Sequence, residues 1–206
     1  MIGKVMTIVK GDYFMINEYT DRGIPDIVRQ RKEAAFNEGF EQSCTDEAGR
    51  LLSVMAAQAG QGRILEIGTG LGVGSAWILS GLSPEAELVS IDNSFERIEK
   101  VRGGIHHKQA IFLHGDWKEA AVHGPFKLIF ADAASAKQKE GEDLIKMLDQ
   151  NGVLFMDDFT PEEHFPEEWK GKPDTVREFW FHHPLMASAE ILLTSKSAAI
   201  IAVKKG

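Results

Sequence analysis

Short, mostly apolar runs alternate with amphipathic segments along the middle of the chain. Runs of this kind are typical of parallel strands that are buried on both faces. They cover residues 64–67, 88–91, 110–113, 126–131 and 152–156. The segments between them carry apolar residues at helical spacing, as at Val73, Ala76 and Trp77. This alternation predicts βαβ units, and therefore an α/β fold with a parallel sheet and right-handed crossovers.

The two ends of the chain depart from this alternation. Residues 13–40 are polar and helical in pattern, with too little apolar surface for a core of their own. A helix with Thr45 as its N-cap is predicted next. Near the other end, an acidic and aromatic loop at 161–173 precedes a helix at 175–182 and two β-rich runs joined by four residues, which requires an antiparallel hairpin. We predict one domain over residues 1–206, with 1–44 as a helical cover.

A glycine-rich turn follows the first apolar run. Glycines occupy every second position from Gly68 to Gly74. Such a turn lets backbone N–H groups approach a ligand closely, and the N-terminus of the following helix adds partial positive charge. The dinucleotide pattern G-x-G-x-x-G does not fit, because its third glycine would fall on Val73 or Ser75.

Every predicted strand ends in a polar or glycine feature. Because ligands of an open parallel sheet bind beyond the carboxyl ends of the strands, we expect these features along one rim. Asp92 lies where a carboxylate can accept both hydroxyls of a ribose, or where it would simply start a helix. The features are Glu66 with the glycine turn, Asp92, Asp116, Asp132, and Asp157 with Asp158.

The composition narrows the classes of function. The 206 residues are 43% hydrophobic and 26% charged, which is typical of a globular domain. The net charge of −8 argues against a large nucleic-acid surface, although a local basic patch remains compatible with it. Cys44 is the only cysteine, so an inert thiol and a reducing compartment are expected. With no convincing signal peptide and no run of membrane-spanning length, we expect a cytoplasmic protein without a membrane partner.

The run Glu66-Ile67-Gly68-Thr69-Gly70-Leu71-Gly72 resembles motif I of the class I methyltransferases that depend on S-adenosyl-L-methionine (SAM). The resemblance implies a Rossmann-like, doubly wound sheet of seven strands, mostly parallel with an antiparallel C-terminal hairpin strand, and helices on both faces. It assigns ribose binding to Asp92 and the adenine amino group to Asp116. Trp117 would line the adenine pocket, although ordinary core packing explains it as well. The SAM-binding candidates are Glu66, Gly68, Thr69, Gly70, Gly72, Ser75, Asp92, Asn93, Asp116, Trp117 and Asp132.

The placing of Asp132, Asp157 and Asp158 resembles the cation-dependent O-methyltransferases, the catechol and caffeoyl-CoA type. Adjacent strands would bring these carboxylates together, and like charges in a partly dry site need a cation or a proton. Oxygen ligands suit Mg²⁺, with Mn²⁺ and Ca²⁺ as alternatives. In that family the metal chelates two neighbouring oxygens of the acceptor and lowers the hydroxyl pKa. The alternative is that Asp132 only faces the SAM sulfonium, while Asp157 and Asp158 are solvated or cap helices.

Two departures from the family pattern concern the metal site and the base. The family usually has Asp-Asn where this chain has Asp157-Asp158, which makes the site more negative. It also commonly has a lysine shortly after the first aspartate, proposed as the base, whereas residues 133–135 here are Ala-Ala-Ser. We take Asp132 and Lys137 as the catalytic candidates.

The leading hypothesis is therefore a SAM-dependent O-methyltransferase that acts on a small catechol-like or phenolic acceptor with a divalent cation. The same chemistry on a hydroxylated uridine of tRNA is an alternative. A nicotinamide-dependent oxidoreductase and a non-catalytic SAM-binding protein are two others. Acceptor specificity is expected on the N-terminal cover and on the loop at 160–173, where His164 is a candidate contact. The resemblance leaves a homodimer open.

Overall fold

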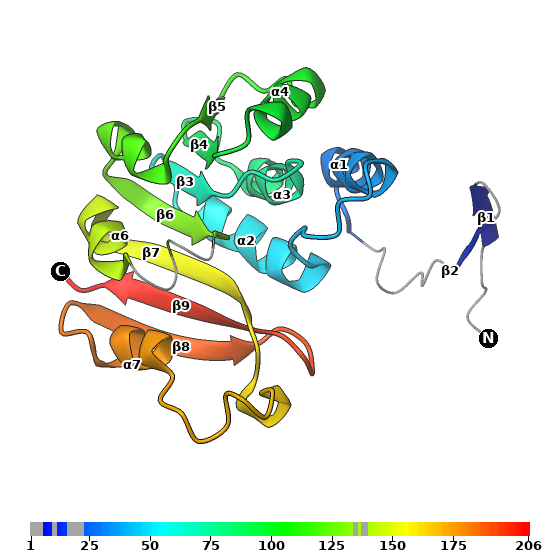
Figure 1. Ribbon diagram of the computed structural model, residues 1–206. Coiled ribbons are helices and arrows are strands. Elements are labelled where there is room, and N and C mark those ends of the chain that lie inside the picture. The colour runs from blue at the N-terminus through cyan, green and yellow to red at the C-terminus, as the bar shows by residue number, and fades with distance from the viewer. Residues whose placement is uncertain (1–5, 10–11, 16–22, 134–135, 137–139) are drawn as a thin grey trace.

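A seven-stranded sheet forms the centre of the computed structural model, which describes residues 6–9, 12–15, 23–133, 136 and 140–206 (Figure 1). The strand order is β5-β4-β3-β6-β7-β9-β8, and only β9 runs against the others. The predicted sheet of seven strands with an antiparallel C-terminal hairpin is therefore confirmed. The strands are β3 (Arg63–Ile67), β4 (Glu87–Asp92), β5 (Ala110–His114), β6 (Phe126–Ala131), β7 (Leu148–Phe159), β8 (Met186–Leu192) and β9 (Ala198–Lys204).

Helices cover both faces of the sheet (Figure 1). One face packs against α2, α3 and α4, with α1 lying outside α3. The other face packs against α7, α6 and the short helix η1. The helices are α1 (Asp26–Asn37), α2 (Asp46–Gln58), α3 (Val73–Gly81), α4 (Phe95–Gly104), η1 (Trp117–His123), α6 (Gly141–Met147), η2 (Glu162–His164) and α7 (Thr175–His182).

Successive side chains of a strand belong to two different hydrophobic cores, one on each face of the sheet. On β3, Ile64 belongs to the core under α2 and α3, whereas the next residue, Leu65, belongs to the core under α6 and α7. Both are fully buried. This two-sided burial explains why the central strands β3 and β6 are mostly apolar, because period-2 alternation places successive residues against one helical layer and then the other.

The register of the sheet aligns the ends of its central strands. Ile67 of β3 pairs with Ile91 of β4 on one side and with Ala131 of β6 on the other. The residues that follow these three therefore leave the sheet at the same level. The strand order also reverses between β3 and β6, which creates the crevice where open α/β sheets bind ligands.

Two local expectations are wrong. Part of the segment expected to be helical forms an antiparallel hairpin of β1 (Met6–Val9) and β2 (Asp12–Met15), and the first helix begins only at Asp26. Aromatic and β-branched residues in these strands carry the β propensity that the polar character of the segment hid. In addition, the sequence spacing of Asn93 and Glu96 predicts a capping box at the start of α4, and this box does not form. Ser94 caps α4 instead, because its side chain accepts a hydrogen bond from the Arg97 N–H.

None of the helices in the described residues combines the length and the apolar character needed to cross a membrane.

Candidate active site

The glycine turn joins β3 to α3 at the rim of the sheet. Gly68, Gly70 and Gly72 adopt φ angles of 100°, 54° and 83°, a left-handed region that side chains with a Cβ rarely occupy. Gly72 is also the residue before the first turn of α3, and its N–H donates to the Thr69 carbonyl. The turn therefore depends on glycine for its shape, and it ends at the positively polarised start of a helix.

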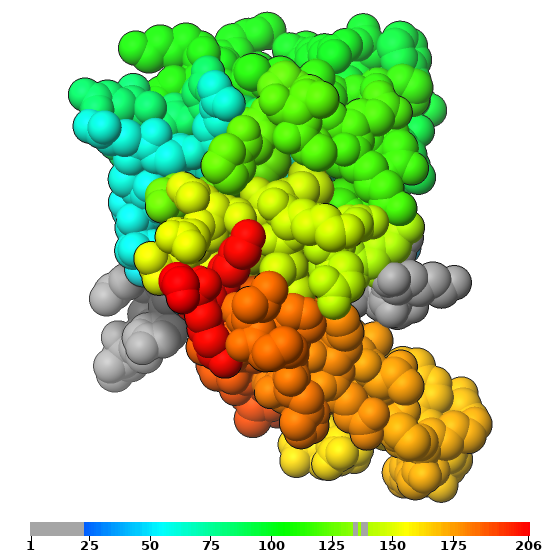
Figure 2. Space-filling model, turned by 90° about the vertical axis from the view of Figure 1, so that its left-hand side faces the viewer, coloured from blue at the N-terminus to red at the C-terminus, as the bar shows by residue number. Residues whose placement is uncertain are grey.

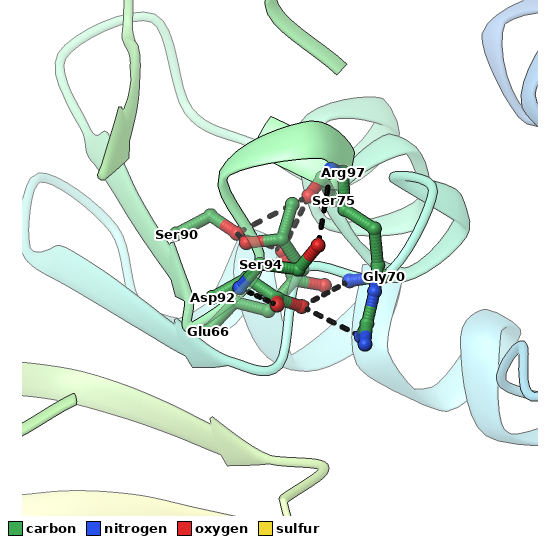
Figure 3. A network of polar contacts seen from close by, with 8 residues as sticks. Glu66, Gly70, Ser75, Ser90, Asp92, Ser94 and Arg97 are labelled. Atoms are coloured by element: carbon green, nitrogen blue, oxygen red, sulfur yellow. Dashed lines mark hydrogen bonds and ion pairs between the residues drawn. The ribbon is translucent and has the colours of Figure 1, made fainter. Parts of the chain in front are cut away.

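A buried carboxyl group supports the turn from below (Figure 3). Glu66 is 1% exposed, and its Oε2 accepts hydrogen bonds from Ser75 and from Ser90 Oγ at 2.5 Å. Burial raises the pKa of Glu66 to about 7, against the opposing effect of the two serine hydroxyls. A Cβ on Gly74 would lie 2.4 Å from Glu66 Oε1, so α3 needs a glycine there to accommodate the carboxyl group.

Asp92 connects the glycine turn to the start of α4 (Figure 3). Its Oδ2 accepts a hydrogen bond from the Gly70 N–H at 3.0 Å and lies 3.3 Å from Arg97 Nη1. Its Oδ1 accepts from the Ser94 N–H at 2.8 Å. Asp92 thus lies at the end of β4, and each of its oxygens already has partners from the chain itself, while its role in ribose binding stays a prediction.

The two residues predicted around the adenine lie beyond β5. Asp116 is exposed and caps η1, where it accepts from the Lys118 N–H at 2.9 Å and forms a capping box with Glu119. Trp117 is 8% exposed and packs in the core under this face of the sheet. Trp117 therefore packs in the core and Asp116 is exposed, while the roles predicted for both at the adenine stay predictions.

The connection between α1 and α2 covers the glycine turn. The Phe40 ring lies 3.2 Å from where a Cβ on Gly70 would stand, and the Arg97 guanidinium lies 5.7 Å from the centre of that ring. Arg31, a buried residue of α1, donates from Nε to the Leu71 carbonyl at 2.9 Å. The cavity left at the turn is only about 10 Å³, which is room for about one water molecule.

The residues that line this small cavity come from three parts of the chain. They include several predicted SAM-binding residues together with the connection after α1. Cys44 is among them, and burial raises the pKa of its thiol, with Asp157 and Asp132 adding to the effect. The lining residues are Phe40, Gln42, Ser43, Cys44, Glu66, Gly68, Thr69, Gly70, Leu71, Val73, Gly74 and Asp132.

Three carboxylates meet at the ends of β6 and β7. One oxygen from each of Asp132, Asp157 and Asp158 lies within 4.8 Å of the others. Asp157 is buried and Asp158 is exposed. The register of β7 against β9 shifts between Met156 and Phe159, and Asp158 has a φ angle of 60°. Successive strand residues normally point to opposite faces of a sheet. This irregularity explains how the carboxylates of Asp157 and Asp158 can nevertheless lie at the same site.

Two further predicted residues are Lys137 and His164. Lys137 lies outside the described residues, so its role as the base stays a prediction. His164 is in η2, and its Nε2 lies 2.7 Å from the Ser195 carbonyl oxygen in the turn between β8 and β9. It is not one of the described residues that line the cavity at the glycine turn.

Sequence reasoning missed Phe40, Arg97 and Arg31. The roles of these residues depend on how α1 and α4 pack, and no local pattern in the sequence predicts that packing. Arg97 alone carried a signal, because a cation placed one helical turn after a strand-end aspartate is within reach of its carboxylate.

Comparison with known proteins identifies the family. Residues 59–200 match the family model described as a methyltransferase domain. A protein of Mycobacterium ulcerans is 30% identical over 122 residues, which cover 53% of each chain. A protein of Mycobacteroides abscessus is 40% identical over 67 residues, 32% of this chain and 31% of that one. Both relatives carry the name O-methyltransferase as an inferred activity. The match spans about half the length of the first relative and about a third of the second.

Solved structures share the fold at low identity. An O-methyltransferase from Bacillus cereus, in complex with SAH, has a TM-score of 0.76 and 19% identity, covering 92% of this chain and 97% of that one. One from Streptomyces achromogenes, involved in tomaymycin synthesis and in complex with SAM, has a TM-score of 0.72 and 18% identity, covering 92% and 95%. The family match gives no support to the nicotinamide-dependent alternative. Since the family model covers most of its length, the chain belongs to the methyltransferase domain family.

Proposed function

We propose that the chain is a SAM-dependent O-methyltransferase that transfers a methyl group to a hydroxyl of a small catechol-like or phenolic acceptor with the help of a divalent cation. The observation that carries this proposal is the meeting of three carboxylates beside a glycine turn at the rim of a methyltransferase sheet. The inferred activity of the mycobacterial relatives supports the choice of oxygen as the methyl acceptor.

The glycine turn is suited to the methionine and ribose parts of SAM. The left-handed glycines carry no Cβ, so a ligand can approach their backbone closely, and the N-terminus of α3 favours a carboxylate. The N–H groups of Gly68, Gly70 and Gly72 themselves already donate within the chain. Asp92 is the acceptor for the ribose hydroxyls. Because Phe40 covers Gly70, SAM binding requires this ring to move aside.

Asp132, Asp157 and Asp158 fit a hard divalent cation. They offer oxygen ligands only, and the mutual repulsion of three close carboxylates favours a bound positive charge. A cation held there would act as a Lewis acid that lowers the pKa of the acceptor hydroxyl and fixes its orientation. Mg²⁺ is the first candidate, with Mn²⁺ and Ca²⁺ next.

Asp132 connects the two halves of the proposed site. It lines the cavity at the glycine turn and also belongs to the carboxylate cluster. Its position would hold the acceptor oxygen next to the methyl donor, so the reaction gains mainly from positioning. Methyl transfer forms an O–C bond, breaks the S–C bond and releases the hydroxyl proton, for which Lys137 remains the proposed acceptor.

The test combines SAM binding with cation-dependent turnover. We expect calorimetry to detect SAM binding, and methylation of catechol to occur with Mg²⁺ and to stop with EDTA. Asp157→Asn should lower kcat/KM by about 100-fold, because a cation ligand loses its charge. Asp149→Asn is the matched control: it lies near the opposite end of the same strand, pairs with Lys127 and should stay within about twofold.

Two outcomes would contradict the proposal in different ways. Absence of SAM binding would refute the methyltransferase function of this chain. Turnover that survives EDTA and Asp157→Asn would refute the cation and leave a metal-independent methyl transfer.

A further inference from the structure

A larger cavity lies beside the carboxylate cluster. Its volume is about 310 Å³, and Asp157 and Asp158 form one side of it. The loop after β7 and the start of α7 form the other sides. The loop, gold in Figure 2, projects from the body next to α7. A volume at the lower end of the range for small-molecule sites suits a ligand with a single ring.

Aromatic side chains form the walls of this cavity. Phe159, Phe165 and Trp169 line it, and the rings of Phe165 and Trp169 meet edge to face with their centres 5.6 Å apart. Trp169 is 49% exposed, so its ring has a large surface that no part of the described chain covers. Flat aromatic surfaces of this kind favour a planar aromatic ligand.

Arg177 fixes these walls in place. Its guanidinium bonds to Glu190 through Nε and Nη2, at 2.7 and 2.8 Å, and to Asp174 through Nη1 at 2.5 Å. The same group lies 5.2 Å from the centre of the Phe159 ring and 5.5 Å from that of Phe165. Two carboxylates therefore offset its charge, and Arg177 serves as a support rather than as a ligand-binding cation.

Lys172 is the second cationic side chain that lines the cavity. Within the described part of the chain it forms no ion pair with a carboxylate. Lys170 in the same loop differs, because it pairs with Glu167 at 2.5 Å and does not line the cavity. The cavity thus has carboxylates at one side and an available ammonium group at another.

We propose that this cavity takes a single-ring aromatic acceptor that carries an acidic group, with Lys172 pairing with that group. The inference rests on the function proposed above, which places the acceptor hydroxyls at Asp157 and Asp158. In that arrangement a divalent cation offsets two of the three charges of the cluster, and Asp174 pairs with Arg177. Among the described cations that line the cavity, Lys172 is the one without a carboxylate in an ion pair, so at its side of the cavity an acid is favoured over an amine.

Three catechols of nearly equal size test whether the cavity prefers a negatively charged ligand. The probes are 3,4-dihydroxybenzoate, 3,4-dihydroxybenzamide and 3,4-dihydroxybenzylamine, titrated by calorimetry into the full chain with Mg²⁺, with and without SAH. Because Lys172 is exposed to solvent, we expect a moderate effect: the benzoate should bind about fivefold more tightly than the amide. The amine should bind most weakly.

Substitutions distinguish the effect of Lys172 on binding from that of the other residues in the loop. Lys172→Met should bring the benzoate to within twofold of the amide and leave the affinity for the amide unchanged. Lys170→Met is the matched control and should keep the fivefold preference. Trp169→Ala should weaken all three probes by a similar factor, because it removes an aromatic wall and no charge.

Each failure has its own meaning. Equal affinity for the benzoate and the amide in the unmodified chain, a tighter amine, or a preference that persists in Lys172→Met would overturn the inference while SAH binding and catechol methylation stand. If none of the diols binds although SAH does, the inference and the proposed acceptor class both fail. If SAH does not bind, the proposed function fails, and the titrations in Mg²⁺ alone still decide the role of Lys172.

Discussion

Glu66 supports the glycine turn, but burying its carboxyl group disfavours the charged form. Its carboxyl group is buried under the glycine turn and accepts hydrogen bonds from Ser75 and Ser90. No hydrogen bond from the described residues reaches its Oε1, which faces Gly74. Two bonds to neutral hydroxyls do not replace the hydration that a carboxylate loses on burial, so the protonated form is favoured.

The first prediction concerns the pH dependence of stability. Because burial raises the pKa of Glu66 from 4.5 to about 7, the folded state binds more protons than the unfolded state between these values. The contribution of Glu66 is fully present below pH 4.5 and is lost as the pH rises through 7. Relative to Glu66→Gln, which stays neutral, the free energy of unfolding of the unmodified chain should fall by about 3 kcal/mol from pH 4.5 to 8. Urea denaturation at several pH values measures this difference, and parallel curves would contradict it.

The sequence predicted the members of the carboxylate cluster but not its geometry. Strand ends are readable from apolar runs, and aligned parallel strands bring their ends together, so Asp132 and Asp157 could be placed side by side. The participation of Asp158 needs the irregularity of β7 against β9. That irregularity is set by pairing with a strand about 40 residues later, and no local pattern specifies it.

At the scale of elements, α1 and the connection after it cover the glycine turn of the proposed site. Arg31 ties α1 to the Leu71 carbonyl, and Lys32 and Lys100 form ion pairs with Asp46 of α2 and with Glu38. The two ion pairs are partly exposed and add little stability on their own. Their effect is to hold the connection in register, so that Phe40 rests on Gly70.

The second prediction tests whether Phe40 is a removable cover. Phe40→Ala removes the ring that lies on Gly70 and stacks with Arg97, a contact worth about 1 kcal/mol. SAM should then bind about threefold to tenfold more tightly, because less closed structure must be displaced. Calorimetry gives the affinity, and thermal unfolding gives any loss of stability separately.

Phe36→Ala is the matched control for this prediction. Phe36 lies one helical turn earlier in α1 and is 63% exposed, so its removal should leave SAM affinity unchanged. Weaker binding in Phe40→Ala would show instead that the ring forms a wall of the occupied SAM site.

The elements of the central domain were predictable because each one satisfies a local rule. Thr45 caps α2 by accepting from the Ala48 N–H, and the apolar runs became the strands of the main sheet. The first residues of the chain were not predictable in the same way. The strand Asp12–Met15 pairs with Met6–Val9, and a β-hairpin of four-residue strands gives too short a pattern to outweigh a polar context.

At the scale of the whole molecule, the reversal of strand order between β3 and β6 divides the proposed site. The glycine turn and Asp92 follow β3 and β4, whereas the carboxylate cluster follows β6 and β7. Asp132, at the end of β6, is hydrogen bonded through its N–H to the Ile67 carbonyl at 2.9 Å and therefore lies at the boundary. SAM and the cation would then bind to neighbouring but separate sets of strands.

This division predicts that the two ligands stabilise the fold separately. A ligand at 100 times its Kd adds about 2.7 kcal/mol to the free energy of unfolding, which corresponds to about 5–10 °C in Tm for a domain of this size. SAH and Mg²⁺ should each raise Tm, and Asp157→Asn should lose the increase with Mg²⁺ while it keeps the increase with SAH, because the glycine turn belongs to other strands. Thermal unfolding followed by circular dichroism measures both increments. An increase with Mg²⁺ that persists in Asp157→Asn would assign the ion to the acidic surface, where 31 Asp and Glu residues against 23 Lys and Arg provide many weak sites.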